Sequence, residues 1–310
     1  MRYDIVCIGM ALVDSIIKGF DPAPVSASGY RAVSDTLSVG GEAVNEAIAA
    51  SKLGMRTAIL CALGQDGAGT LVKAELKSAG VDTGLIIDEP STPVTTMFVK
   101  DDGTRKSITN EAHRYNFHPE KYQSGFTDTR VIILGSLFRA PFDDPEIIYS
   151  VVRAAHEAGS LIIADTKLPN FRKLGLADLA ASLPMIDYIT PNEDEARYFT
   201  GKEAPEEMAD VFLDDGVKNV IIKLGGKGCL LKNRETSFFL PAYPIKAADA
   251  TGAGDNFVAG FASEIIHGSG IREALQFGNA CGAICATAVG AGTALKDRKQ
   301  VQDWLQSVPR

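Results

Sequence analysis

The 310-residue sequence lacks a cysteine framework and any block of basic residues. Its cysteines are scattered, odd in number and without C-x-x-C spacing, so neither a disulfide framework nor a zinc site is expected. They are Cys7, Cys61, Cys229, Cys281 and Cys285. The formal charge of −8 and the absence of a Lys/Arg block argue against a nucleic-acid partner. We therefore expect buried free thiols and a small-molecule partner.

Long apolar runs are also missing. No stretch reaches the roughly 18 apolar residues that a membrane span needs. The start Met1–Asp4 leads only into a short apolar segment, which does not resemble a signal peptide. We expect a cytoplasmic protein with no membrane partner.

Two common nucleotide-binding fingerprints are absent as well. The chain contains no G-x-x-x-x-G-K-[ST] sequence, and no G-x-G-x-x-G leads from a strand into a helix. Without these motifs, the P-loop and dehydrogenase hypotheses lose their main support.

What is present is a globular composition with a regular alternation of elements. Hydrophobic residues make up 45% of the chain and charged residues 23%. Apolar runs of strand length occur at Ile5–Gly9, Thr57–Leu63, Val131–Gly135, Leu161–Asp165, Tyr188–Thr190 and Val220–Leu224. Helical periodicity occurs at Glu42–Leu53, Thr70–Ser78, Glu146–Ala158, Glu193–Thr200, Glu206–Asp214, Asp255–Gly268, Ile271–Ala288 and Asp297–Leu305. This pattern predicts an α/β fold with a doubly wound, mostly parallel sheet flanked by helices.

Residues 14–40 and 91–110 interrupt this alternation. Both carry strand-like patterns without crossover helices, and the second holds a hairpin turn at Lys100–Gly103. They predict a small β-sheet lid on a main domain made of residues 1–13, 41–90 and 111–310. Because such a sheet has unpaired edges and an apolar face, we expect a homodimer formed through the lid.

The segment Asp249–Asp255, with the sequence DATGAGD, carries the clearest chemistry. Gly252 and Gly254 directly precede an apolar helix, so backbone N–H groups at its first turn can converge on one anion. Asp255 lies at the same helix start, where the helix dipole normally keeps a carboxylate ionised. This arrangement suits a general base beside a phosphoryl cradle. A glycine turn with Asp255 as a simple cap is the alternative.

The same segment, followed by Asn256 and Phe257, resembles the C-terminal motif of the ribokinase-like, or PfkB, family of carbohydrate and nucleoside kinases. Gly40–Ala47, with the sequence GGEAVNEA, is similar to the family's N-terminal motif. The resemblance covers nearly the whole chain and implies an ATP-dependent carbohydrate kinase. It implies that Asp255 is the base and that the amides of Thr251–Gly254, including Gly252, Ala253 and Gly254, hold the γ-phosphate.

The N-terminal motif predicts acceptor contacts. Gly40 and Gly41 would let the backbone approach a sugar closely, and Asn45 on the following helix would hydrogen-bond its hydroxyls. Asp14, just after the first strand, resembles the family's sugar-binding aspartate. A capping role before Ser15 is the alternative for Asp14.

Further motifs resemble the family's nucleotide and metal contacts. Asn192 and Glu195 match an N-x-x-E element that helps to hold hydrated Mg²⁺ and the phosphates, and Asn192 would also suit a helix cap. The nucleotide-binding residues that the resemblance implies are Asn192, Lys223, Gly225, Gly226, Gly228, Thr251 and Asn279, where helix packing is the alternative for Asn279. The segments around Asp249, Thr251, Cys285, Ala288 and Gly290 are similar to the potassium-binding loop of some members. Ala294 stands where ribokinase has a serine ligand, and Asp249 is the candidate for a monovalent cation.

The acceptor is less well defined. Thr166 and Lys167 follow Asp165 where fructokinase-like and ketodeoxygluconate-kinase-like relatives usually carry D-P-N-x-R. Lys167 could contact a carboxylate or phosphate of the substrate, or point to solvent as most lysines do. Further candidates are Arg105, Thr109, Asn110 and Arg139. We expect phosphorylation of a hydroxyl of a small sugar or sugar derivative, a sugar acid among the candidates. The alternative is a non-catalytic sugar- or nucleotide-sensing protein on the same fold.

Overall fold

An eight-stranded sheet forms the centre of the computed structural model, which describes residues 1–19, 31–100, 104–110 and 117–308. The strand order is β14-β13-β12-β11-β10-β9-β1-β4. The strands from β12 to β4 in this order are parallel, whereas β13 and β14 are antiparallel additions at one edge. Their bounds are β1 Tyr3–Ile8, β4 Thr57–Leu60, β9 Thr129–Leu137, β10 Leu161–Thr166, β11 Tyr188–Ile189, β12 Asn219–Lys223, β13 Gly228–Asn233 and β14 Ser237–Pro241.

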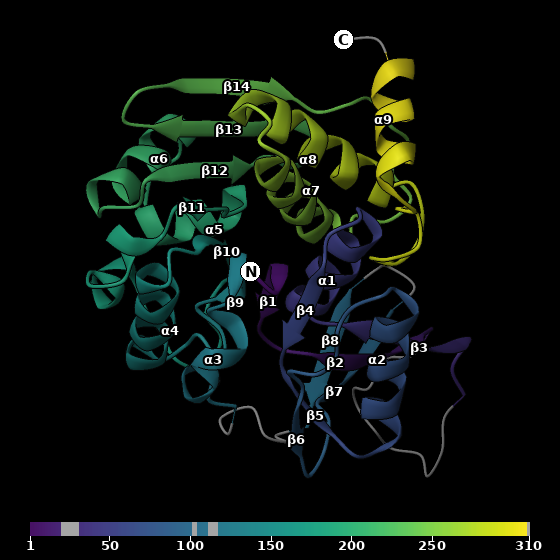
Figure 1. The fold of residues 1–310 in the computed structure, drawn as a ribbon. Coiled ribbons are helices and arrows are strands. Elements are labelled where there is room, and N and C mark those ends of the chain that lie inside the picture. The colour runs from purple at the N-terminus through teal and green to yellow at the C-terminus, as the bar shows by residue number, and fades with distance from the viewer. Residues whose placement is uncertain (20–30, 101–103, 111–116, 309–310) are drawn as a thin grey trace.

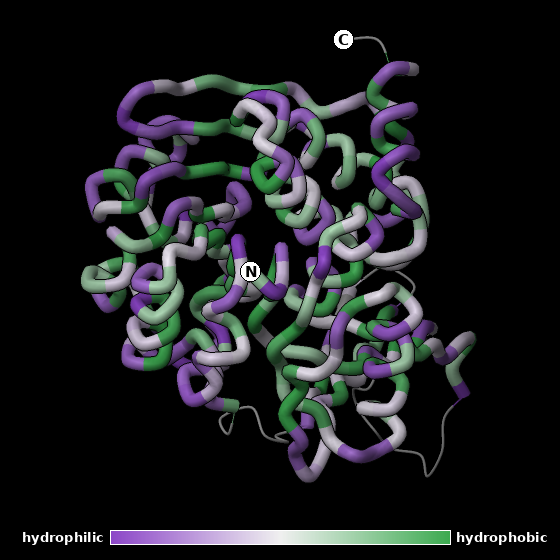
Figure 2. Tube along the Cα trace, viewed as in Figure 1, coloured by the Kyte–Doolittle hydropathy of each residue, from purple (hydrophilic) through white to green (hydrophobic). Residues whose placement is uncertain are grey.

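Helices cover both faces of this sheet (Figure 1). They are α1 Glu42–Lys52, α2 Gly67–Ser78, α3 Gln123–Phe126, α4 Pro145–Glu157, α5 Glu193–Thr200, α6 Pro205–Asp214, α7 Ala253–His267, α8 Ile271–Cys285 and α9 Arg298–Ser307. Alternate strand residues feed two separate cores, one shared with α1, α7 and α8 and the other with α4 and α6. Because both faces are buried, the central strands are hydrophobic along their length, as the green strands of Figure 2 show.

A second, four-stranded sheet has the order β3-β2-β7-β8 and lies beside α2 (Figure 1). Its strands are β2 Leu12–Lys18, β3 Ser34–Gly40, β7 Val94–Val99 and β8 Arg105–Thr109. The predicted hairpin joins β7 and β8, which pair antiparallel. A further parallel pair joins β5 Ala62–Gly64 to β6 Ile87–Glu89. None of the described helices combines the length and apolar character that a bilayer crossing needs.

The predicted doubly wound sheet is confirmed, with two differences. The apolar run Thr57–Leu63 divides into β4 and β5, which belong to different sheets. The edge strands β13 and β14 were not among the predicted strands; they pair antiparallel, and no crossover helix separates them from β12 or from each other. Together they widen the sheet beside the end of β12, where Lys223 stands.

Candidate active site

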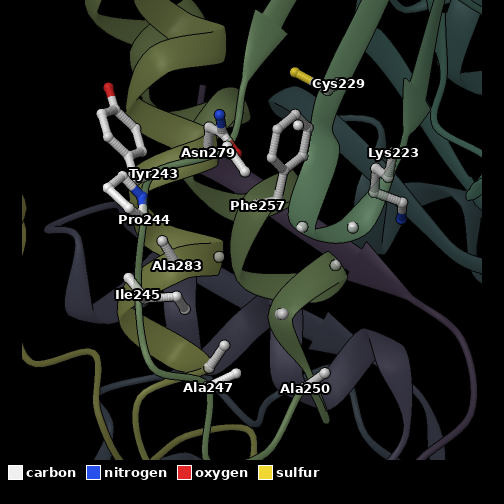
Figure 3. A pocket seen from close by; sticks show the side chains of 18 residues that line it. Lys223, Cys229, Tyr243, Pro244, Ile245, Ala247, Ala250, Phe257, Asn279 and Ala283 are labelled. Atoms are coloured by element: carbon white, nitrogen blue, oxygen red, sulfur yellow. The ribbon is translucent and has the colours of Figure 1, made fainter. Parts of the chain in front are cut away.

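Two hollows lie at the carboxyl end of the central strands, where open α/β sheets place their ligands. The first has a volume of about 360 Å³ and is shown in Figure 3; because it contains five of the predicted nucleotide-binding residues, we call it the nucleotide cavity. It is lined by Lys223, Gly225, Gly226, Gly228, Cys229, Ala242, Tyr243, Pro244, Ile245, Ala247, Ala250, Ala253, Gly254, Phe257, Asn279, Gly282, Ala283 and Ala286. Its walls are therefore mainly apolar side chains and bare backbone.

The first turn of α7 forms one end of this cavity. Gly252 caps the helix with φ 76°, and a Cβ there would lie 2.2 Å from the Ala291 Cβ, so the position requires glycine. The backbone N–H groups of Gly254 and Asp255 have no acceptor in the described part of the chain. Amides open at a helix N-terminus form an anion site. The predicted anion hole of Thr251–Gly254 is therefore present only in part, because Thr251 N donates to Asp249 Oδ1 at 3.0 Å and Ala253 N donates to Ala250 O at 3.2 Å.

Asp255 lies in the first turn of α7 and is 9% exposed. The Asn45 amide donates a 2.7 Å hydrogen bond to its Oδ2. Burial, together with the charges of Glu42 and Asp165, raises the pKa of Asp255 to about 7. The tertiary environment at the start of α7 therefore opposes the helix dipole, which favours the ionised carboxylate. The capping alternative also fails, because Gly252 is the cap residue and no side chain caps α7.

The second hollow has a volume of about 590 Å³ and is bounded by charged side chains; because it contains four of the predicted substrate-binding residues, we call it the acceptor pocket. It is lined by Met10, Leu12, Asp14, Gly41, Glu42, Pro93, Thr95, Met97, Ser107, Thr109, Asn110, Ser136, Arg139, Ala140, Lys167, Asn170 and Phe171. The four-stranded sheet supplies one wall, and the segments after β9 and β10 supply another. Gly40 and Asn45 do not line it, and the side chain of Arg105 lies outside the described residues.

An ion pair at the start of α1 dominates this pocket. Lys167 Nζ lies 2.5 Å from Glu42 Oε1, and Ser136 Oγ donates to Glu42 Oε2 at 2.6 Å. Although burial opposes its charged form, the Lys167 charge and these hydrogen bonds lower the pKa of Glu42 to about 2. Lys167 is therefore held toward the pocket, which corrects the expectation that it points freely to solvent. Glu42 was not among the predicted site residues because its partner, Lys167, is far away in the sequence and is brought close only by the fold.

Asp14 lies within β2, not at a helix start, so the capping alternative does not apply. Burial and the nearby Glu42 raise its pKa. Its Oδ2 would lie 2.6 Å from a Cβ on Gly40, and Gly41 has φ 104° with no room for a Cβ beside Met10 O. The two glycines therefore allow β3 and α1 to pass close to the Asp14 carboxylate.

Asn110 borders the same pocket, but its side-chain amide forms hydrogen bonds with the backbone. Its Oδ1 accepts from Val94 N at 2.8 Å, and its Nδ2 donates to Thr92 O at 3.3 Å. These bonds tie the end of β8 to the start of β7. The side chain thus shapes the pocket wall.

Asn192 and Glu195 form a reciprocal capping box at the start of α5. Glu195 Oε2 accepts from Asn192 N at 3.0 Å and from Thr166 Oγ1 at 2.8 Å. An isolated β-bridge sets Asn192 beside Lys223, next to the nucleotide cavity. Both predicted roles, helix capping and proximity to the phosphates, are compatible with this placement.

The remaining predicted nucleotide contacts divide into two groups. Lys223, Gly225, Gly226, Gly228 and Asn279 share the cavity, and Asn279 Nδ2 donates to Pro241 O at 2.9 Å. Thr251 is exposed and does not line it; its Oγ1 donates to Asp249 Oδ1 at 2.7 Å. In Figure 3, Tyr243, Pro244 and Ile245 stand on one side and Lys223 on the other.

Two buried carboxylates in the site were not predicted. Asp165 ends β10 and accepts from Lys223 Nζ at 2.5 Å. Glu46 is fully buried on α1, and neither of its oxygens has a partner in the described residues. Burial and the charges of Asp165 and Asp255 raise its pKa well above the usual range. The only signal for either residue was an acidic side chain inside an apolar run, which does not by itself indicate a site.

Comparison with known proteins gives consistent matches over the chain. The profile of the pfkB family carbohydrate kinases matches residues 3–298. A ribokinase of Haemophilus influenzae is 28% identical, with 87% of this chain and 88% of the relative covered. An ATP-dependent ribose-1-phosphate kinase of Halopiger xanaduensis is 30% identical, with 82% of each covered. The solved Arabidopsis thaliana ribokinase, in complex with ribose and ATP, has a TM-score of 0.86 and 26% identity, covering 99% of both chains.

Proposed function

The chain belongs to the pfkB family of carbohydrate kinases, an ATP-dependent kinase family, and from this we propose that it phosphorylates a hydroxyl of a small sugar or sugar derivative in the acceptor pocket. One observation carries the proposal. Asp255, whose pKa is raised to about 7, lies in the helix turn whose open amides face the nucleotide cavity. A base with such a pKa is suited to accept a hydroxyl proton at neutral pH.

In the proposed reaction, Asp255 takes the proton of the acceptor hydroxyl as its oxygen bonds to the γ-phosphorus. The bond from that phosphorus to the ADP oxygen breaks. Asn45 holds the Asp255 carboxylate in position, and the Gly254 and Asp255 amides donate to the charge on the transferred group. The small four-stranded sheet would act as a lid, because it contributes Asp14 and Thr95 to the acceptor pocket.

The residues near Asn192 fit a hydrated Mg²⁺. Oε2 of Glu195 is occupied by two protein donors, whereas no partner in the described residues bonds Oε1, which can accept from a metal-bound water. Within the described residues, no cluster of three His, Cys, Asp or Glu side chains is arranged to ligate a metal directly. When bound, Mg²⁺ supplies charge neutralisation on the β- and γ-phosphates.

The residues of the predicted potassium site fit a bound cation less well than the residues near Asn192 fit hydrated Mg²⁺. The Asp249 carboxylate accepts from Thr251 and from Gly290 N, and the Lys52 ammonium donates to Gly292 O at 2.6 Å. Cys285 Sγ lies 3.5 Å from Thr251 O. Protein donors thus occupy both carboxylate oxygens of Asp249 and the carbonyl oxygen of Gly292, and we assign no step to a monovalent cation.

The acceptor pocket suits a polyhydroxylated molecule and leaves room for an anionic one. The Asp14 carboxylate has no partner in the described residues and can accept from hydroxyl groups. The guanidinium of Arg139 donates from Nε to Leu168 O at 2.7 Å, and its terminal NH₂ groups have no acceptor within the described part of the chain. We include neutral sugars, sugar acids and sugar phosphates as candidate acceptors. The relative named as a ribose-1-phosphate kinase supports keeping the last class.

ATP consumption over a panel of free sugars, sugar acids, sugar phosphates and nucleosides tests the proposal. In Asp255→Asn, we expect kcat to fall by about 10³-fold, because general-base catalysis supplies about 10²–10⁴. Calorimetry should show ATP affinity close to that of the wild-type protein. Unchanged kcat in this variant would refute the mechanism. Sugar or nucleotide binding without turnover would favour the sensing alternative.

We also propose a homodimer through the four-stranded sheet. Leu37 and Ile108, 61% and 66% exposed, lie in one row of residues across the sheet, joined by Ser15 and Thr96. Asp14 and Thr95 are the next residues along their strands, so side-chain alternation puts this row on the face opposite the acceptor pocket. Burying these apolar side chains would stabilise a pair of lids. Light scattering should give twice 32.9 kDa for the wild-type protein and 32.9 kDa for Ile108→Asp.

A cytoplasmic location is part of the proposal. All five cysteines are unpaired and buried. Free thiols in this number suit a reducing compartment. Fractionation of cells that produce the protein would test the assignment.

A further inference from the structure

Two lysine–aspartate pairs lie at opposite ends of β12. Lys218, directly before the strand, pairs with Asp187 at 2.7 Å, and Lys223 at its end pairs with Asp165 at 2.5 Å. The side chains of the first pair are 47% and 20% exposed, whereas those of the second are 14% and 4% exposed. A lysine–aspartate ion pair is therefore solvated at one end of β12 and buried at the other end, beside the nucleotide cavity.

Burial of the second pair is not explained by stability. Taking two charges out of water costs about as much as, or more than, their attraction returns. Asp165 is additionally fixed by Thr190, whose Oγ1 donates to Asp165 Oδ1 at 2.6 Å. The pair is therefore held in one geometry at an energetic cost, which favours a functional role for it.

The ammonium group of this pair reaches the anion hole. Lys223 lines the nucleotide cavity, and its Nζ would lie 3.2 Å from a Cβ on Gly254. Because Gly254 has no side chain, nothing from that residue separates the ammonium from the open amides of α7. In Figure 3 Lys223 stands across the cavity from Tyr243 and Pro244.

Carboxylates on three elements keep this lysine charged. The Lys223 ammonium is attracted by the negative charges of Asp165 on β10, Glu195 on α5 and Asp255 on α7. Burial works against the ammonium form, but these carboxylates outweigh it and raise the pKa of Lys223. The group therefore remains a hydrogen-bond donor over the working pH range.

We propose that the Lys223 ammonium contacts the γ-phosphoryl group during transfer and that Asp165 is the residue that positions it. The inference rests on the proposed kinase function and gives Lys223 a catalytic role rather than a role in nucleotide binding alone. As the acceptor oxygen–phosphorus bond forms and the bond to ADP breaks, the proton passes to Asp255. Lys223 keeps its protons and donates to the non-bridging oxygens, where charge accumulates.

The test compares Lys223→Met with Lys223→Arg, with the double variant Lys223→Met/Asp165→Asn and with Lys218→Met as the matched control. The double variant removes both charges, so no unpaired carboxylate is left buried to unfold the protein. We expect Lys223→Met and the double variant to lose about 10²–10³ in kcat, with little change in the KM of the acceptor. Lys223→Arg should recover part of the loss, and Lys218→Met should match the wild-type protein.

A binding measurement makes the test independent of the acceptor. By calorimetry, the double variant should lose about tenfold or more in affinity for the non-hydrolysable ATP analogue AMP-PNP, but not for ADP, because only the former carries a γ-phosphoryl group. A structural role would lower both affinities together or neither. Equal loss for the two nucleotides, or wild-type kcat in a folded double variant, would overturn the proposal. Failure of the wild-type protein to phosphorylate any acceptor would count against the proposed function instead, since the affinity comparison would still report on Lys223.

Discussion

The nucleotide cavity and the acceptor pocket both lie at the carboxyl end of the central strands but are built in opposite ways. The nucleotide cavity is lined mainly by glycine, alanine and other apolar residues, and its polar groups are mostly backbone. The acceptor pocket is lined by charged and polar side chains, among them Asp14, Glu42, Arg139 and Lys167. A phosphate chain, common to every kinase that uses ATP, can be held by amides. A particular acceptor has to be selected by side chains.

This difference predicts which kind of substitution impairs the function of each hollow. Apart from Lys223, the nucleotide cavity should lose little when a side chain is truncated, and it is damaged mainly when atoms are added. A site made of side chains is damaged when they are removed. The comparison therefore gives paired experiments with opposite kinds of substitution.

The largest effect is expected from adding atoms at the anion hole. Gly254 has ordinary helical backbone geometry, and the nearest heavy atom to a Cβ there is Lys223 Nζ at 3.2 Å, so Gly254→Val should fold with a small displacement of that ammonium. Its branched side chain would occupy the space in front of the open amides, and we expect kcat to fall by about 10²–10³. Gly67→Ala, at the start of α2 and outside both hollows, is the control, since a Cβ at Gly67 meets nothing within 4 Å. Retained turnover in a folded Gly254→Val protein would contradict the backbone cradle.

A smaller effect is expected from removing atoms in the acceptor pocket. Asp14→Ala deletes a carboxylate that can accept acceptor hydroxyls, and hydrogen bonds to charged groups contribute about 1.5–3 kcal/mol. We expect kcat/KM for the acceptor to fall by about 10–100-fold, whereas the KM for ATP stays close to the wild-type value. Steady-state kinetics with each substrate varied in turn distinguish the two. Equal changes for both substrates would mean that the hollows are not separable in this way.

The same difference between the hollows decides how much of the site could be predicted from the sequence. The nucleotide side was predicted because two glycines directly before an apolar helix indicate an anion site, and Gly252 indeed requires its φ of 76°. The acceptor side was predicted only in part. Glu42 and Lys167 are far apart in the chain, and neither carries a local signal for the pair that they form. The expectation for Lys167 therefore followed the average behaviour of lysines.

The fold shows a similar division. Helices and parallel strands were predicted closely because continuous apolar runs and helical periods mark them, as for α5 at Glu193–Thr200. The edge strands β13 and β14 follow β12 through turns with no crossover helix between them, so the alternation of strands and helices did not mark them. The raised pKa of Asp255 was not predicted for a related reason. The helix dipole is visible in the sequence, whereas burial and the charges of Glu42 and Asp165 depend on tertiary packing.

The smallest effect tests whether the two hollows are coupled electrostatically through Asp255. A protonated Asp255 cannot accept the hydroxyl proton, so kcat of the wild-type protein should fall below pH 7, near the pKa of about 7 that burial and neighbouring charges produce. Glu42→Gln removes a like charge and leaves Lys167 unpaired, and both changes favour the carboxylate form of Asp255. The acid limb should therefore move to lower pH, by about half a unit to one unit. Glu157→Gln, on the exposed end of α4, is the control that should leave the profile in place. An unmoved limb in Glu42→Gln would show that the charges of the acceptor pocket do not reach the base.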